Sequence, residues 1–126
     1  MVMRALLLAK LLTVALFALP AAAGEHLRLM MFEQDWCEYC EQWNAEVGVI
    51  YDRTPEGAKA PLWRVDIFDP VPEGVTLSRG TQFTPTFVLL RDGVEISRIE
   101  GYPGEDFFWG MLDGMLKRAN AKTTDG

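Results

Sequence analysis

The stretch WCEYC at residues 36–40 decides how this sequence is interpreted. It holds both cysteines of the 126-residue chain. A nearly continuous apolar run precedes it, as in a strand that is buried on both faces, and a segment compatible with a helix follows it. We therefore expect a strand over residues 26–32, a turn at residues 35 and 36, and a helix from Cys37 toward Val49.

The position of the two cysteines favours redox chemistry over a structural disulfide. The first turn of a helix has unpaired N–H groups and a partial positive charge, which lower the pKa of a thiol placed there. Cys37 is therefore predicted to be the attacking thiolate. Cys40, one turn deeper on the same face, is predicted to resolve the mixed disulfide. A bridge between them closes a very small loop and would constrain the unfolded chain little.

The rest of the chain combines strand and helix patterns. A β-branched and aromatic segment, an Asp92-Gly93 turn and an alternating segment predict a hairpin. The last segment has acidic residues in its first turn, basic residues in its last turn and apolar residues at helical spacing, which predicts a helix. The expected elements are a loop over 53–61, a strand over 62–68, a short helix within 75–80, strands over 86–90 and 94–100, and a helix over 105–119.

This order of elements predicts an α/β fold with a mixed four-stranded sheet and helices on both faces. A helix between the first two strands implies a parallel crossover, and the hairpin adds antiparallel strands. We expect Trp43, Trp63 and Trp109 in or near the core. One aromatic residue of the stretch 107–109 must point away from it.

Residues 1–23 have the three-part form of a secretory signal peptide. Arg4 and Lys10 supply positive charge, residues 11–19 are apolar, and Pro20 leads into three alanines. The uninterrupted apolar run is short for a bilayer span. We therefore expect cleavage after Ala23, export to the periplasm, and a domain over residues 24–126 with no stable membrane span. The alternative is an uncleaved anchor over residues 5–23.

Charge and composition exclude some classes of function. The formal net charge is −6, and no basic patch is present, which argues against a nucleic-acid partner. Two thiols and the single histidine, His26, fall short of the four ligands of a structural zinc site. We expect no metal ion, and no cofactor apart from the redox-active Cys37–Cys40 disulfide.

A second motif, Thr84-Pro85-Thr86, opens the strand at residue 86. Together with the Trp-Cys-x-x-Cys motif and Gly101 before the last helix, it resembles the thioredoxin superfamily over roughly residues 26–119. The resemblance implies a thioredoxin-like fold in which Pro85 is cis and lies against the cysteine pair. It also implies that the backbone of Thr84 pairs with an incoming substrate strand. Trp36 and Tyr39, at the rim of the motif, are expected to contact substrates, and Trp36 to shield the disulfide.

The stretches CEYCEQWNAEVG, WRVDIFDPVP, FTPTFVLLRDG and RIEGYPGEDFFWG are similar to the SoxS-type periplasmic thioredoxin-like proteins. This likeness implies an exported thiol–disulfide oxidoreductase that reduces partner-protein disulfides and is linked to bacterial sulfur oxidation. Its partners would be periplasmic protein thiols and disulfides and a membrane electron donor of the DsbD/CcdA type.

The chain departs from the thioredoxin pattern at two points. Glu38 and Tyr39 replace the usual Gly-Pro between the cysteines. Met31 stands where the family buries an acid, which leaves the proton acceptor for Cys40 undefined.

The absence of a histidine between the cysteines favours a reductant, with a potential nearer the roughly −270 mV of thioredoxin than the roughly −120 mV of DsbA. Two other functions remain open at this point. One is a metal-binding module or metallochaperone that uses the same two cysteines, and the other is a non-catalytic adaptor on a thioredoxin scaffold.

Overall fold

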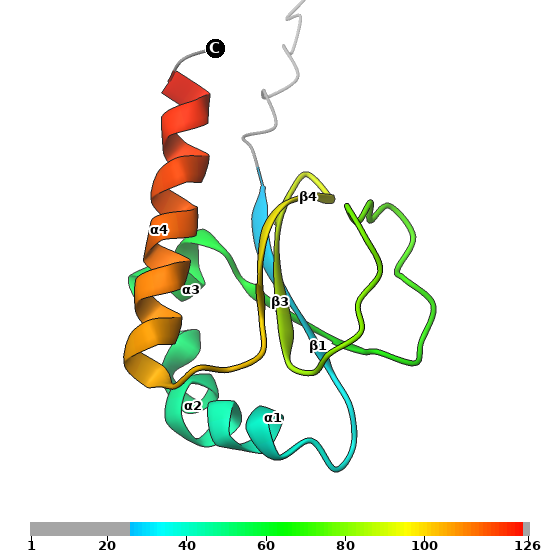
Figure 1. Ribbon diagram of the computed structural model, residues 1–126. Coiled ribbons are helices and arrows are strands. Elements are labelled where there is room, and N and C mark those ends of the chain that lie inside the picture. Colours follow the sequence, from blue (N-terminus) through cyan, green and yellow to red (C-terminus); the bar gives the residue numbers. More distant parts are fainter. Residues whose placement is uncertain (1–25, 125–126) are drawn as a thin grey trace, which may run out of the picture.

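A computed structural model describes residues 26–124 of the chain (Figure 1). The predicted signal at residues 1–23 lies outside the described residues. The elements in chain order are β1 (Leu27–Glu33), α1 (Glu38–Trp43), the π-helical turn η1 (Asn44–Gly48), α2 (Val49–Tyr51), α3 (Pro55–Lys59), β2 (Leu62–Asp66), β3 (Thr86–Arg91), β4 (Val94–Glu100) and α4 (Glu105–Thr124).

The four strands form one mixed sheet in the order β2-β1-β3-β4. Strands β1 and β2 run parallel, with Met31 opposite Arg64. Strand β3 is antiparallel to both β1 and β4. The predicted parallel crossover and the predicted hairpin are both confirmed.

The turn between β3 and β4 forms as the Asp-Gly pair predicts. Asp92 and Gly93 both have a positive φ, at 50° and 83°. A Cβ at residue 93 would clash with the carbonyl oxygen of Gly74. Glycine is therefore required there by the turn and by the close approach of the coil after β2.

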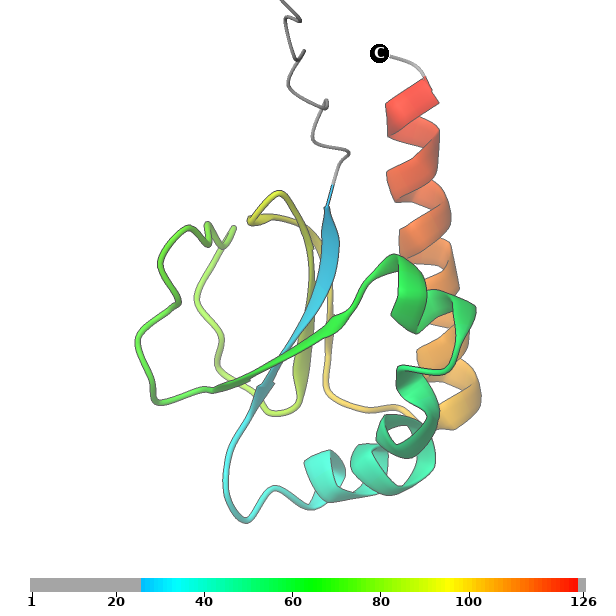
Figure 2. The same cartoon turned by 180° about the vertical axis from the view of Figure 1, so that it is seen from behind.

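The helices cover one face of the sheet, so the expectation of helices on both faces is wrong (Figures 1 and 2). Alternate residues of β1 point to opposite faces of the sheet. Leu29 and Met31 pack in a cluster with α1, η1 and α4, and Met30 and Phe32 pack in a second cluster on the opposite side. The second cluster is completed by two residues of the long coil between β2 and β3, Val75 and Leu77.

That coil does not contain the predicted short helix at 75–80, because its backbone pairs with β4 instead of with itself. The amide of Thr76 donates to the carbonyl of Gly93 at 2.9 Å, and the amide of Glu95 donates to the carbonyl of Thr76 at 2.9 Å. These bonds form an isolated bridge between residue 76 and β4. The coil is therefore held as an extended cover over the sheet.

A buried ion pair on β4 also holds this coil. The side chains of Glu95 and Arg98 are each only 4% exposed, and they bond to each other. Glu95 also accepts from the amide of Ser78, and Arg98 donates to the carbonyl oxygens of Arg79 and Gly80. The coil leads directly into Thr84 and Pro85, so this network supports the segment beside the cysteine pair.

The predicted loop at 53–61 contains helix α3. Thr54 is its N-cap, with the hydroxyl oxygen accepting from the amide of Gly57 at 3.0 Å. Pro55 occupies the first turn, where its missing N–H and fixed φ favour a helix instead of breaking one. The predicted helix from Cys37 is present, but a π turn interrupts it at residue 44 and it continues to Tyr51.

The last helix, α4, extends beyond its predicted end at residue 119. It packs in the cluster that contains Leu29, Met31 and both cysteines, called here the cysteine-side cluster. Phe108 and Leu112 are fully buried, whereas Phe107 is 71% exposed. Phe107 is thus the aromatic residue that points away from the core. Trp43 lies in the core, and Trp63 and Trp109 pack at its edges, as predicted.

Candidate redox site

The two cysteines lie at the start of the first helix, directly after the end of β1. Cys37 is the N-cap residue of α1, with extended backbone at φ −92° and ψ 100°. Its Sγ accepts a hydrogen bond from the amide of Cys40 at 3.1 Å. The two sulfurs form a disulfide, with the Cα atoms 5.2 Å apart. An N-cap sulfur that accepts a backbone N–H is placed where a thiolate is stabilised.

The two cysteines differ in access to solvent. Cys37 is 8% exposed and Cys40 is 3% exposed, and both belong to the buried cluster on the helix side of the sheet. An incoming partner therefore reaches Cys37 first. This arrangement favours the predicted order of attack, with Cys40 as the second thiol.

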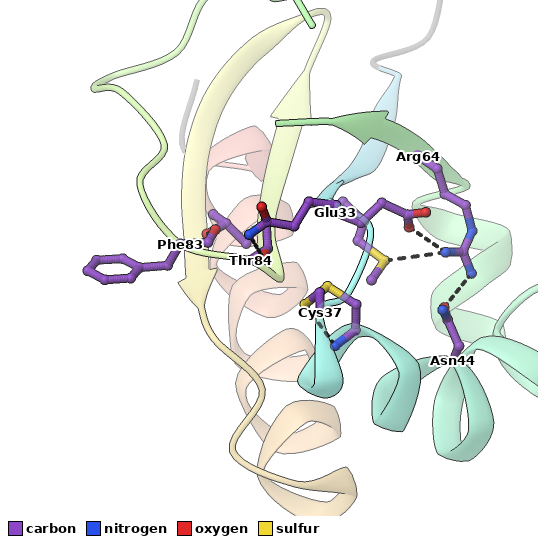
Figure 3. Close-up of a disulfide and its surroundings, with 10 residues drawn as sticks. Glu33, Cys37, Asn44, Arg64, Phe83 and Thr84 are labelled. Carbon is purple, nitrogen blue, oxygen red and sulfur yellow. Dashed lines mark hydrogen bonds and ion pairs between the residues drawn. A yellow bond between two sulfur atoms is a disulfide. The ribbon is translucent and has the colours of Figure 1, made fainter. Parts of the chain in front are cut away.

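The segment that opens β3 lies in the surroundings of the disulfide (Figure 3). The amide of the Gln34 side chain, three residues before Cys37, donates to the hydroxyl of Thr84 at 2.6 Å. The Thr84–Pro85 peptide bond is cis, as the thioredoxin resemblance implies, and Pro85 is buried. The structure thus brings together two motifs that lie almost fifty residues apart in the sequence.

Three exposed aromatic side chains border this region. Trp36 is 98% exposed, Phe83 is 60% exposed and Tyr39 is 57% exposed. Trp36 has a positive φ of 63° in the turn before the helix, and this conformation turns the ring into solvent. The expectation that Trp36 shields the disulfide is therefore wrong, and its ring is free to contact a partner. Sequence reasoning missed Phe83, whose only signal was its place beside Thr84.

An ion pair that the sequence did not predict lies in the surroundings of the disulfide. Met31 is fully buried in the cysteine-side cluster, at the position where thioredoxins bury an acid. Arg64, on β2, bonds to the carboxylate of Glu33 and donates to Asn44 Oδ1 at 2.8 Å. Figure 3 labels Glu33, Arg64 and Asn44 in the surroundings of the disulfide and marks these bonds with dashed lines.

A tyrosine ties the helix of the site to the end of β4. The hydroxyl of Tyr102 donates to Glu46 Oε2 at 3.1 Å. Burial and this bond to a carboxylate raise the pKa of Tyr102 to about 12. The phenol is therefore neutral at neutral pH and keeps its hydrogen bond.

Two further findings concern residues 26–124 only. No cluster of three or more histidine, cysteine or acidic side chains in this part of the chain could hold a metal ion. No helix among these residues has the length and apolar character that crossing a membrane requires.

A known protein family matches most of the chain. The sequence profile of the family described as "Thioredoxin-like domain" matches residues 18–116. The chain belongs to this family. Its fold is accordingly thioredoxin-like, and its cysteine pair is the Cys-x-x-Cys motif of a thiol–disulfide oxidoreductase in the general sense.

Solved structures give a more specific likeness. The chain is 52% identical to the periplasmic thioredoxin SoxS from Paracoccus pantotrophus, with a TM-score of 0.73, covering 75% of this chain and 99% of that one. A thioredoxin from Malassezia sympodialis, Mala s 13, shares only 18% identity at a TM-score of 0.50, covering 73% and 76% of the two chains, and supports the fold alone. Among curated proteins, none matches the chain significantly.

Replacing Trp36 by alanine separates partner contact from folding. The ring is almost wholly exposed, so we expect the free energy of unfolding to change by less than about 0.5 kcal/mol. We expect kcat/KM for a protein disulfide to fall about tenfold, because one anchoring aromatic contributes on the order of 1–2 kcal/mol to an interface. Reduction of a small disulfide such as glutathione should be unchanged.

The matched control for that substitution is Phe107→Ala, which removes another exposed aromatic ring, on α4. It should leave both substrates unaffected. Equal losses for Trp36→Ala and Phe107→Ala would contradict a substrate contact at Trp36.

Proposed function

We propose that this thioredoxin-like protein is an exported dithiol reductant of partner-protein disulfides in the periplasm, acting through Cys37 and Cys40. The observation that carries the proposal is the hydrogen bond from the amide of Cys40 to the Sγ of Cys37 at the start of a helix. The 52% identity to a periplasmic thioredoxin supports the compartment. The signal-like sequence at residues 1–23 supports export.

The proposed reaction exchanges one disulfide for another. In the reduced protein, the thiolate of Cys37 attacks a substrate disulfide, and the first substrate sulfur leaves as a thiol after taking up a proton. Cys40 then loses its proton and attacks the Sγ of Cys37. The second substrate thiol is released and the Cys37–Cys40 disulfide forms. Two electrons pass to the substrate in each cycle.

The structure suggests how a substrate would be held for this reaction. Thr84 lies in the surroundings of the disulfide, and this residue and the cis Pro85 that follows it would align an extended substrate segment. Trp36 and Tyr39 would contact its side chains, together with the newly found Phe83.

The cycle requires a source of electrons and a physiological partner. We propose a membrane donor of the DsbD/CcdA type for re-reduction, and partner proteins of a sulfur-oxidation system as substrates. Both come from the likeness to SoxS-type proteins.

Insulin reduction tests the proposed activity. The purified protein, with dithiothreitol as electron donor, should accelerate precipitation of the insulin B chain well above the dithiothreitol background.

Redox titration against glutathione or dithiothreitol should give a potential nearer about −270 mV than about −120 mV. A potential at the oxidising end of this range would contradict a reducing role.

A further inference from the structure

The ion pair of Glu33 and Arg64 has its positive end toward the buried cluster that contains Met31 and the two cysteines. Arg64 stands opposite Met31 in the parallel register of β1 and β2. Its Nη1 atom bonds Glu33 Oε2 and lies 3.8 Å from Met31 Sδ. Met31 is fully buried in the cluster that also contains Cys37 and Cys40. The guanidinium therefore lies directly behind one of the side chains packed with the two cysteines.

The guanidinium is held in place from several directions. Its Nη2 atom donates to Asn44 Oδ1 at 2.8 Å, and its Cζ lies 5.6 Å from the centroid of the Trp43 ring. The backbone N–H of Asn44 in turn donates to the carbonyl oxygen of Cys40. Arg64 is thus coupled to the helical turn that carries the second cysteine, and its charge has a fixed position relative to the sulfurs.

We propose that the Glu33–Arg64 pair sets the redox equilibrium of the Cys37–Cys40 couple, with Arg64 favouring the dithiol form and Glu33 favouring the disulfide. This inference rests on the proposed function, since it assigns a tuning role at the same site. Both are positioning residues that act through charge without contacting the substrate.

Only one of the two redox states of the cysteine pair carries a formal charge. The disulfide is neutral, whereas the reduced pair holds a thiolate. A nearby cation stabilises that thiolate and so stabilises the reduced form, and a nearby anion has the opposite effect. Because the two charges oppose each other, removing either one alone should shift the equilibrium, in opposite directions.

Solvent screening limits how strongly each charge interacts with the thiolate. The side chains of Arg64 and Glu33 are 40% and 32% exposed, so solvent reduces this interaction. We expect each single substitution to change the equilibrium constant with glutathione by about three- to tenfold, where tenfold corresponds to about 30 mV.

The experiment equilibrates the purified protein with glutathione redox buffers and measures the oxidised fraction by alkylation of free thiols. Arg64→Met should make the couple about three- to tenfold more reducing, and Glu33→Gln should make it more oxidising by a similar factor. Glu33→Gln keeps the side-chain shape and a hydrogen bond to Arg64, so it tests the charge. The double variant should return close to the wild-type equilibrium.

Arg79→Met is the matched control, because it removes an arginine from an exposed ion pair between the coil after β2 and Glu100 at the end of β4. It should leave the equilibrium constant unchanged. Shifts of the two single variants in the same direction, or no shift in either, would overturn the proposal. These equilibria are read with glutathione alone, so a failure to reduce insulin would contradict the proposed function and leave this result standing.

Discussion

Replacing Cys37 by serine is expected to reduce insulin-disulfide reduction to the background rate of dithiothreitol alone. Cys37 is the N-cap sulfur that accepts a backbone N–H and the more exposed of the two cysteines. A serine hydroxyl can accept the same hydrogen bond, so the helix start should be preserved. The measurement is the initial rate of insulin precipitation with dithiothreitol, at matched protein concentrations.

The control for this loss is a measurement that the variant keeps the fold. Far-ultraviolet circular dichroism of Cys37→Ser should match that of the reduced wild-type protein. Substantial activity in Cys37→Ser would mean that Cys40 attacks first, which would contradict the assigned order of the two thiols.

Breaking the buried ion pair between Glu95 and Arg98 on β4 should strongly reduce the stability of the fold. In Arg98→Met, the carboxylate of Glu95 remains in a site that is only 4% exposed and loses its partner. Removing one member of a buried pair costs about 3–5 kcal/mol. For a domain of this size we expect Tm to fall by about 15 °C, measured by thermal denaturation.

The exposed pair of Arg79 and Glu100 supplies the comparison. Its side chains are 60% and 40% exposed, so solvent screens the pair and Arg79→Met should cost much less stability than Arg98→Met. Similar losses in Arg79→Met and Arg98→Met would show that burial of the Glu95–Arg98 pair does not control its contribution.

The same ion pair predicts how stability depends on pH. Burial alone would raise the pKa of Glu95, but hydrogen bonds from Arg98 and Ser78 outweigh it and lower that pKa below the ordinary value of 4.5. A glutamate with a lowered folded-state pKa stabilises the protein above its unfolded-state pKa, and this stabilisation is lost as pH falls through the folded-state value. The free energy of unfolding from urea titrations should therefore fall below about pH 4.5. In Arg98→Met this acid-dependent loss should be smaller, and an equal loss in both proteins would contradict the assignment to Glu95.

The parts of the fold that the sequence predicts are those governed by local patterns. The apolar run before Cys37 and the Asp92-Gly93 turn each specify their own backbone conformation, and both are found where expected. Composition predicts a loop over residues 53–61, but Pro55 lies in the first turn of α3, where proline favours a helix. The coil near Thr76 is extended where a short helix is predicted, because its backbone partner Val94 lies on β4, eighteen residues along the chain, and no local pattern reveals that pairing.

The candidate site likewise has some features that the sequence predicts and others that it does not. The Cys-x-x-Cys motif and the Thr-Pro motif can be read directly from the sequence, whereas their roles in catalysis stay predictions. Glu33 and Arg64 come together only through the register of two parallel strands, which no local pattern specifies. The exposure of Trp36 depends on a backbone angle, and a tryptophan beside a buried cysteine gave no signal for it.

The most direct test of the central claim is capture of a partner by the Cys40→Ser variant. We expect the reduced variant, mixed with a protein disulfide such as insulin, to accumulate a covalent adduct that dithiothreitol releases. Peptide mass spectrometry should place the link at Cys37. Absence of any adduct, with Cys37 fully reduced at the start, would contradict the claim that this sulfur attacks protein disulfides.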